Sequence, residues 1–121
     1  MGVKPEIWGP ALWGAIHMAC LTGTATAEFM NAIADVIPCP SCGTHFSQLL
    51  MEFPFPDGGD AATLFQWSVN IHNKVNARIG KPIFTVEQAL QRWSGQPSSQ
   101  FNMIIIVLFV FLLLFALSKL L

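Results

Sequence analysis

The sequence predicts an all-α fold, with a four-helix bundle, a short fifth helix and a C-terminal transmembrane helix. Three observations lead to this prediction. Apolar residues recur at three- and four-residue intervals in successive segments, which is the period of an amphipathic helix. Proline and glycine separate these segments, and none of them alternates apolar and polar residues as a half-buried strand would. The C-terminal segment is almost continuously apolar.

The first predicted helix covers residues 7–22, with Pro10 in its first turn, where the missing N–H would be unpaired in any case. Trp13 and His17 lie four residues apart and share one face. Read alone, this histidine is more typical of an interior side chain than of a functional group. A separate apolar stripe consists of Trp8, Leu12, Ile16 and Ala19.

The second predicted helix covers residues 26–37 and ends at Pro38, because proline interrupts a helix. The third begins around Cys39 and continues to about Phe53, so that Cys39 and Cys42 lie at its first turn. Backbone N–H groups and the positive end of the helix dipole favour a thiolate there. A reactive thiol is therefore well placed at this helix start.

The fourth predicted helix covers residues 61–79 and is capped by Asp60. A polar cluster of His72, Asn73 and Asn76 interrupts its otherwise apolar sequence. An ordinary solvated face would carry Glu and Lys, so this cluster indicates hydrogen bonding to something large and polar. The core side consists of Leu64, Trp67, Ile71 and Val75.

Gly80 ends the fourth helix, and a capping box formed by Thr85 and Gln88 starts a short fifth helix through Trp93. The next residues are rich in Gly, Ser and Pro, which is typical of a flexible linker. The expected divisions are a domain at 1–93, a linker at 94–100 and a membrane anchor at 101–121.

The predicted anchor contains one polar residue, Asn102, between Phe101 and Leu117. As a helix this stretch spans about 26 Å, close to the ~30 Å hydrocarbon core of a bilayer. No secretory signal is recognisable at the N-terminus, so we expect residues 1–100 to face the cytosol. The net charge of −1 includes no basic stripe, which leaves nucleic-acid binding without support.

Cys39 and Cys42 decide the functional interpretation, because two cysteines at this spacing form either a redox pair or half of a metal site. A zinc ion could be held on paper by these thiols with His45 and His72, but a second cysteine pair is absent. Thioredoxin-type domains need strands around such a pair, so it belongs to another scaffold. A pair of small buried residues is the remaining interpretation.

A dithiol that acts as a net oxidant needs an electron acceptor. The four tryptophans, the His-Asn cluster and nearby Lys81 suit a flat, polar, phosphate-bearing cofactor. No Gly-x-Gly-x-x-Gly loop indicates a dinucleotide site of the Rossmann type. The residues alone leave open a flavin-free dithiol shuttle, a zinc-binding adaptor and a non-catalytic membrane-anchored protein.

Four motifs occur in a characteristic order. They are Trp8-Gly9-Pro10-x-x-Trp13-x-x-x-His17, Cys39-x-x-Cys42-x-x-His45-Phe46, His72-Asn73-x-Val75-Asn76-x-x-x-Gly80-Lys81-Pro82 and Arg92-Trp93. Together they closely resemble the Erv/ALR family of FAD-linked sulfhydryl oxidases over residues 5–93. The short chain with its anchor looks most like the viral members from large cytoplasmic DNA viruses.

The resemblance implies that FAD sits in the mouth of the four-helix bundle. Cys42 would lie next to the flavin, Cys39 would be reached by substrate, and His45 would pack close to the flavin. These three residues are the implied catalytic set. The implied cofactor-binding residues are Gly9, Trp13, His17, His72, Asn73, Val75, Asn76, Lys81, Arg92 and Trp93.

The resemblance also implies a thiol oxidase that uses a Cys39–Cys42 disulfide to form disulfide bonds in a partner protein. Electrons would pass to FAD and then to O2, giving H2O2. The partner would be a thioredoxin-like protein or a small carrier with a cysteine pair. A homodimer, anchored in a host or virion membrane, is also implied.

Two departures from the family pattern stand out. Many members carry a structural disulfide at positions that correspond here to Val69 and Val86, so we predict an apolar contact in its place. Many members also carry a second, shuttle cysteine pair. Here only Cys20 remains, within the first helix, so electrons would come directly from the partner's dithiol.

Overall fold

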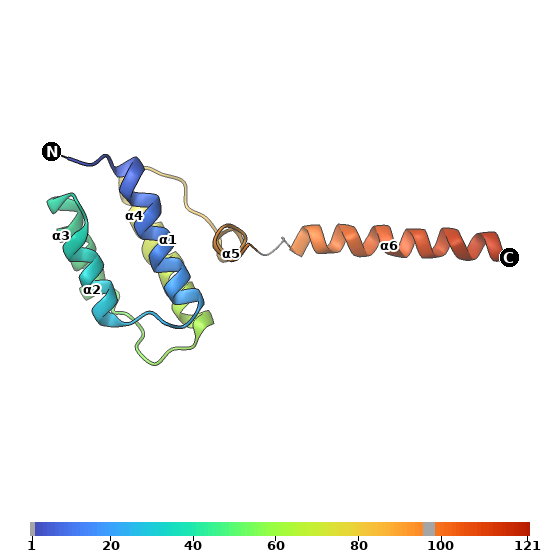
Figure 1. Ribbon diagram of the computed structural model, residues 1–121, viewed down its shortest axis with the longest axis horizontal. Coiled ribbons are helices and arrows are strands. Elements are labelled where there is room, and N and C mark those ends of the chain that lie inside the picture. The colour runs from blue at the N-terminus through green and yellow to red at the C-terminus, as the bar shows by residue number, and fades with distance from the viewer. Residues whose placement is uncertain (1, 96–98) are drawn as a thin grey trace.

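The computed structural model describes residues 2–95 and 99–121, and these ranges contain helices and connecting loops but no strand. The all-α prediction is therefore confirmed for the described part of the chain. Figure 1 shows four helices side by side, a fifth set across them, and a sixth projecting away. The elements are α1 (Pro5–Leu21), α2 (Ala27–Val36), α3 (Pro40–Glu52), α4 (Ala61–Ile79), α5 (Val86–Ser94) and α6 (Ser99–Leu120).

The helix boundaries follow from local capping chemistry. The Thr26, Asp60 and Thr85 side chains accept hydrogen bonds from backbone N–H groups at the starts of α2, α4 and α5. The predicted capping box is confirmed, because Gln88 also binds the backbone N–H of Thr85. Gly80 ends α4 with a φ of 75°, a left-handed conformation that favours glycine.

The main core lies between the four bundle helices, where α1 packs on α4 and α2 packs on α3. α2 and α3 approach closely at Gly43, where an added Cβ would lie 2.8 Å from the carbonyl oxygen of Ala34. Glycine is therefore required where the third helix crosses the second. The buried apolar side chains of this core include Ile16, Cys20, Met30, Ile33, Phe46, Leu64 and Ile71.

A second, smaller core seats α5 against α4. Phe65, Val69 and Ala89 are buried in it, and Val86 and Trp93 pack against them. Val69 and Val86 thus belong to one apolar cluster, while a direct contact between the two side chains stays a prediction. This cluster fixes α5 so that one of its sides borders the bundle's cavity described below.

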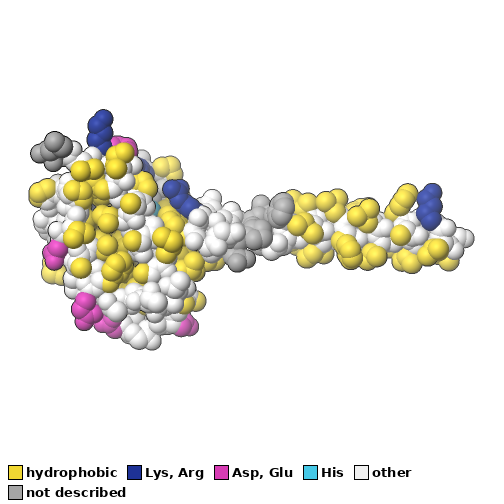
Figure 2. Space-filling model, viewed as in Figure 1, with side chains coloured by type: hydrophobic (Ala, Val, Ile, Leu, Met, Phe, Trp, Pro, Cys, Tyr) yellow, Lys and Arg dark blue, Asp and Glu magenta, His cyan; other side chains and the backbone are white. Residues whose placement is uncertain are grey.

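The apolar helix α6 begins at Ser99, two residues earlier than the predicted anchor. Its stretch Asn102–Leu120 is long and apolar enough to cross a membrane, with a mean hydropathy of 2.9 and no burial within the chain. Figure 2 shows apolar side chains along this helix, with a basic side chain near its C-terminal end. Residues 96–98 of the predicted linker lie outside the described residues.

Candidate functional site

The cysteine pair forms a disulfide at the N-terminus of α3. Cys39 is the N-cap, and its sulfur accepts a hydrogen bond of 3.3 Å from the backbone N–H of Cys42. Both side chains are half-buried, so the bond is partly accessible. After reduction, the helix N-terminus would stabilise a thiolate here.

A cavity of about 1280 Å³ opens beside this disulfide. Protein sites for small molecules and cofactors usually occupy ~300–1,000 Å³, so this one has room for a large cofactor. Cys42 lines the cavity, whereas Cys39 does not. The predicted site residues that line it are Gly9, Trp13, Cys42, His45, His72, Val75, Asn76, Lys81, Arg92 and Trp93.

Aromatic rings form much of one cavity wall. The rings of Trp13 and His72 stack with centroids 3.8 Å apart and planes inclined by 5°. Phe84 meets the His72 ring edge-on at 4.9 Å, and Trp93 also lines the cavity. Such surfaces favour contact with another flat ring.

His17 lies behind this wall and does not line the cavity. Its Nδ1 is 2.8 Å from the Ser68 hydroxyl, and its Nε2 is 2.8 Å from Nδ1 of His72. The sequence-based interpretation of His17 as an interior histidine with a partner agrees with this position. Its direct contact with a cofactor stays a prediction.

Both of these histidines are held neutral. Burial, followed by the charge of Arg92, lowers the pKa of His17 to about 4. Burial, followed by the charges of His17, Arg92 and Lys81, lowers the pKa of His72 to about 3. The pair is therefore uncharged at neutral pH and acts through hydrogen bonds.

Asn73 and Asn76 of α4 bind the backbone of the segment that follows the helix. Asn73 accepts from the N–H of Phe84 at 3.0 Å and donates to its carbonyl at 2.7 Å. Asn76 donates to the Pro82 carbonyl at 3.3 Å. The amide cluster therefore fixes a stretch of this chain, although the sequence suggested a large external polar group.

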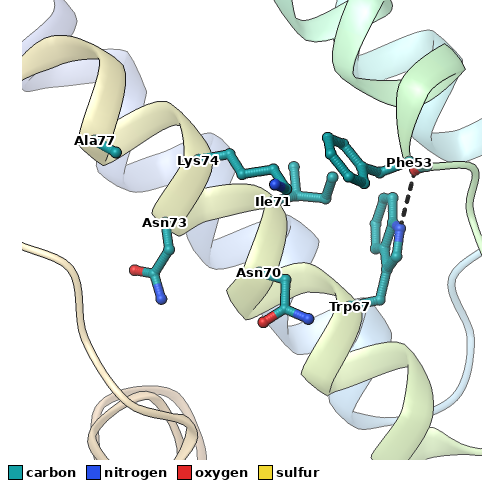
Figure 3. A pocket seen from close by; sticks show the side chains of 7 residues that line it. All are labelled: Phe53, Trp67, Asn70, Ile71, Asn73, Lys74 and Ala77. Carbon is teal, nitrogen blue, oxygen red and sulfur yellow. Dashed lines mark hydrogen bonds between the residues drawn. The ribbon is translucent and has the colours of Figure 1, made fainter.

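Asn73 does not line the large cavity, and its direct contact with a cofactor stays a prediction. It borders a second pocket of about 510 Å³ on another face of α4 (Figure 3). There the Trp67 indole N–H donates to the Phe53 carbonyl at 3.2 Å, and the Lys74 ammonium lies 3.7 Å from the Phe53 ring centroid. These contacts fasten the end of α3 to α4.

The cavity wall carries more positive than negative side chains. Arg78, Lys81 and Arg92 line it, and Glu6 is the acidic residue among its lining side chains. The Arg78 guanidinium also donates a hydrogen bond to Nε2 of His45. This balance suits an anionic group such as a diphosphate.

The residues present fit a flat, phosphate-bearing cofactor such as FAD. Aromatic rings suit its ring systems, and the cationic side chains suit its phosphates. Gly9 adds a further observation, because a Cβ there would meet no atom of the chain within 4 Å. At this cavity-lining position, glycine leaves open space for a bound group.

Cys20 is the free cysteine and lies fully buried in α1. Burial raises the pKa of its thiol to about 11, against a smaller lowering by a hydrogen bond with Ser68. Among the residues described, no group of three His, Cys, Asp or Glu side chains is placed to hold a metal ion. The four zinc ligands considered from sequence thus do not form such a group.

Sequence reasoning missed three residues that shape this site: Ser68, Arg78 and Phe84. Ser68 had a recognisable signal, because it precedes His72 by four residues and Asn76 by eight on the same helix. Arg78 and Phe84 act on partners 33 and 11 residues away, and no local pattern marked them.

Comparison with known proteins shows a consistent relationship. Residues 10–94 match the sequence model of the Erv1 / Alr family. The FAD-linked sulfhydryl oxidase ERV1 of Oryza sativa is 38% identical over 66 residues, which cover 54% of this chain and 34% of the rice protein. The chain therefore spans about a third of the length of that relative.

Viral relatives match over a larger share of their length. The FAD-linked sulfhydryl oxidase homologue 347L of Invertebrate iridescent virus 6 is 26% identical over 106 residues, covering 75% of this chain and 96% of the viral protein. Homologue R368 of Acanthamoeba polyphaga mimivirus is 29% identical over 100 residues, covering 74% and 70%.

The fold is similar to solved structures of yeast Erv1. The FAD binding domain of Erv1 from Saccharomyces cerevisiae superimposes with a TM-score of 0.67 at 24% identity, covering 78% of this chain and 99% of that domain. A mutant of the same protein gives a TM-score of 0.69 at 22% identity, covering 81% and 90%. With a family match over most of its length and this shared fold, the chain belongs to the Erv1 / Alr family.

Proposed function

We propose that this protein is an FAD-dependent thiol oxidase that forms disulfide bonds in a partner protein and reduces dioxygen to hydrogen peroxide. One observation carries the proposal: the disulfide lies across the boundary of the cavity, with Cys42 in its wall and Cys39 outside it. The names of the relatives, FAD-linked sulfhydryl oxidases, support the same chemistry.

The cavity residues would hold FAD through complementary chemistry. Trp13, His72 and Trp93 would contact its rings, and Lys81 with Arg92 would neutralise its phosphates. When bound, FAD supplies a two-electron acceptor that dioxygen can reoxidise. His17 and Asn73 would act indirectly, His17 by supporting His72 and Asn73 by fixing the backbone of Phe84.

The disulfide's own chemistry follows from its two surroundings. A thiolate of the substrate attacks Sγ of Cys39, forms a mixed disulfide and releases Cys42 as a thiolate. The substrate's second thiolate then attacks the substrate sulfur of that mixed disulfide and releases Cys39. The substrate is thereby oxidised to a disulfide, and the cysteine pair holds the two electrons. Cys42 keeps its sulfur on the cavity side, where the pair is reoxidised.

The substrate is proposed to be a dithiol protein, either thioredoxin-like or a small carrier with a cysteine pair. The chain contains three cysteines, and the third, Cys20, is fully buried. It therefore cannot relay electrons from an external thiol without opening the fold. This supports direct transfer from the partner's dithiol to Cys39.

We further propose that α6 anchors the protein in a host or virion membrane with residues 1–100 on the cytosolic side, and that the protein is a homodimer. The length and hydropathy of Asn102–Leu120 support the anchor. Lys119 near its end is long enough to place its ammonium at the membrane surface. The homodimer is carried over from the family resemblance.

An absorbance spectrum of the full chain, purified in detergent, tests the proposed activity. A flavin band in the blue should bleach when dithiothreitol is added without air and return with air, with oxygen consumption and peroxide formation. Cys42→Ser should keep the band but lose the bleaching. A folded, colourless protein that exchanges disulfides without consuming oxygen would instead identify a flavin-free dithiol protein.

A further inference from the structure

The buried contacts behind His72 contain a chain of hydrogen bonds whose direction can be worked out. The chain runs from the carbonyl of Phe65 through Ser68 and His17 to His72. Ser68 and His17 are fully buried, so water does not share these bonds. Each short contact requires one hydrogen between its two heavy atoms.

The carbonyl end fixes the first direction. The Ser68 hydroxyl lies 2.7 Å from the Phe65 carbonyl oxygen, and a carbonyl can only accept. The single hydroxyl hydrogen of Ser68 is therefore used there, because the Cys20 thiol, whose pKa is raised by burial, is itself protonated and can donate to Ser68. At the 2.8 Å contact with His17, Ser68 must accept, so Nδ1 of His17 carries a hydrogen.

The hydrogen on Nδ1 of His17 determines which ring nitrogen of His72 carries a hydrogen. Neutral His17 with its hydrogen on Nδ1 has a lone pair on Nε2. The 2.8 Å contact to Nδ1 of His72 therefore needs its hydrogen from His72. Burial keeps both rings neutral, which leaves Nε2 of His72 as a hydrogen-bond acceptor.

This acceptor is available to the cavity. His72 lines the cavity, and its hydrogen bond within the described chain uses Nδ1. Among the described residues, no fully buried side-chain nitrogen or oxygen lacks a partner, so Nε2 of His72 reaches the surface of the cavity.

Asn76 presents a second acceptor one helical turn further along α4. Its amide nitrogen donates to the carbonyl of Pro82, which again can only accept. The amide oxygen is therefore the free end, and Asn76 lines the same cavity. The carbonyls of Phe65 and Pro82 can only accept, and they thus determine that His72 and Asn76 both present an acceptor to the cavity.

We propose that Ser68 and His17 are positioning residues that hold His72 in its Nδ1–H form, so that Nε2 of His72 and Oδ1 of Asn76 select a bound group with hydroxyl or amino donors. This rests on the proposed function, in which the bound group is FAD, whose ribose hydroxyls and adenine amino group are such donors. A group that offers acceptors here would leave buried lone pairs facing each other.

The decisive measurement is the tautomer of each histidine. The full chain, labelled with ¹⁵N and held in detergent micelles, would be studied at pH 7 by long-range ¹H–¹⁵N correlation, before and after FAD is added. Single His→Gln variants assign the three histidines. We expect His17 and His72 to carry hydrogen on Nδ1. Hydrogen on Nε2 of either ring would overturn the proposal, and the tautomers themselves are measured on the unmodified chain.

A variant at Ser68 distinguishes a residue that orients His72 from one that only fills space in the core. Ser68→Ala removes the hydroxyl that accepts from Nδ1 of His17. We therefore expect mixed tautomers at His72 and a rise of about tenfold in the Kd for FAD. An unchanged His72 tautomer in this variant would contradict the role of Ser68. Ser47→Ala on α3 is the matched control and should change neither measurement.

A pair of substitutions at His17 tests the link between the rings. His17→Gln keeps an acceptor for His72 and should preserve its Nδ1–H form, whereas His17→Leu should lose it. Equal His72 spectra in both variants would overturn the proposal. The proposed function fails separately: a protein that shows the predicted tautomers but binds no FAD would refute the oxidase and leave the positioning intact.

Discussion

Two regions of this molecule use the same residue types in opposite ways. The redox turn contains Cys39, Ser41, Cys42 and His45 at the start of α3, and its disulfide is partly accessible. The buried polar network contains His17, Cys20, Ser68 and His72 between α1 and α4. Cysteine, serine and histidine are reactive candidates in the first region and hydrogen-bonding core residues in the second.

The difference lies in solvent access and in the position along a helix. The redox turn meets a helix N-terminus, which stabilises negative charge on sulfur. In the buried polar network, loss of solvent disfavours charge on every group, so the pKa of Cys20 rises and the pKa values of His17 and His72 fall. Residue type alone therefore does not identify the reactive thiol.

The largest expected contrast is in turnover. Cys42→Ser should abolish dithiol-dependent oxygen consumption, because the redox disulfide cannot form. Cys20→Ala should stay within about twofold of the unmodified protein, since Cys20 takes no part in exchange. Oxygen-electrode assays on the full chain compare the two. Loss of turnover in Cys20→Ala with normal folding would break the comparison between the regions.

Alkylation should sharpen the contrast directly. In the reduced, folded protein at pH 8, iodoacetamide should modify Cys39 and Cys42 while Cys20 stays unmodified. At a pKa of about 11, only about one thousandth of Cys20 is thiolate at that pH, and the side chain is also buried. Mass spectrometry of peptides gives the rates, with denaturant as the control that should expose all three thiols. Rapid native modification of Cys20 would contradict its burial.

Acid should destabilise the buried polar network. His17 and His72 have pKa values of about 4 and 3 in the folded protein, below the ~6.5 of an unfolded histidine. Their contribution to stability is complete above pH 6.5 and is lost as the pH falls toward 4, because the unfolded chain takes up protons first. The free energy of unfolding should fall by up to about 2.7 kcal/mol per pH unit, or about 1.36 for each histidine.

Urea unfolding between pH 7 and pH 4.5 measures this slope on the full chain. His72→Gln should reduce it by about half, since one titrating group is removed. A free energy of unfolding that does not change over this range would show that the histidines are not held neutral.

The smallest expected effect is on the packing of α3, whose first turn contains the redox turn, against α2. Gly43→Ala would place a Cβ 2.8 Å from the Ala34 carbonyl and should destabilise the fold by about 1–3 kcal/mol. Thermal unfolding should show a decrease in Tm of about 4–8 °C per kcal/mol. Gly14→Ala in α1 is the matched control, because its Cβ would lie 3.8 Å from the nearest atom, an ordinary contact. Equal Tm values for the two variants would show that α3 can shift away from α2.

Local sequence patterns were sufficient to predict the helices. Asp60, Thr85 with Gln88, and Gly80 mark helix ends by chemistry that depends on a few neighbouring residues. Pro38 likewise ended the second predicted helix and placed the redox turn at the start of α3. Most of the site residues that the family resemblance implied do line the cavity.

Long-range partners could not be read from local patterns. His17 meets Ser68 across 51 residues of sequence, and the crossing of α2 and α3 at Gly43 depends on the final packing of the two helices. Asn73 looked like a ligand-binding amide, but its groups are satisfied by the backbone of Phe84. Helical spacing gives the face of a side chain, while tertiary packing decides what meets it.

The double hydrogen bond from Asn73 to Phe84 has a consequence for affinity. It holds Phe84, while Asn76 holds Lys81 and Pro82, so a ligand entering the cavity meets a segment that is already tied to α4. Ordering a loop on binding would cost conformational entropy, about 1–2 kcal/mol for each residue fixed. Here that entropy is lost before the ligand arrives, and preorganisation of this kind leaves more of the contact energy for holding the ligand.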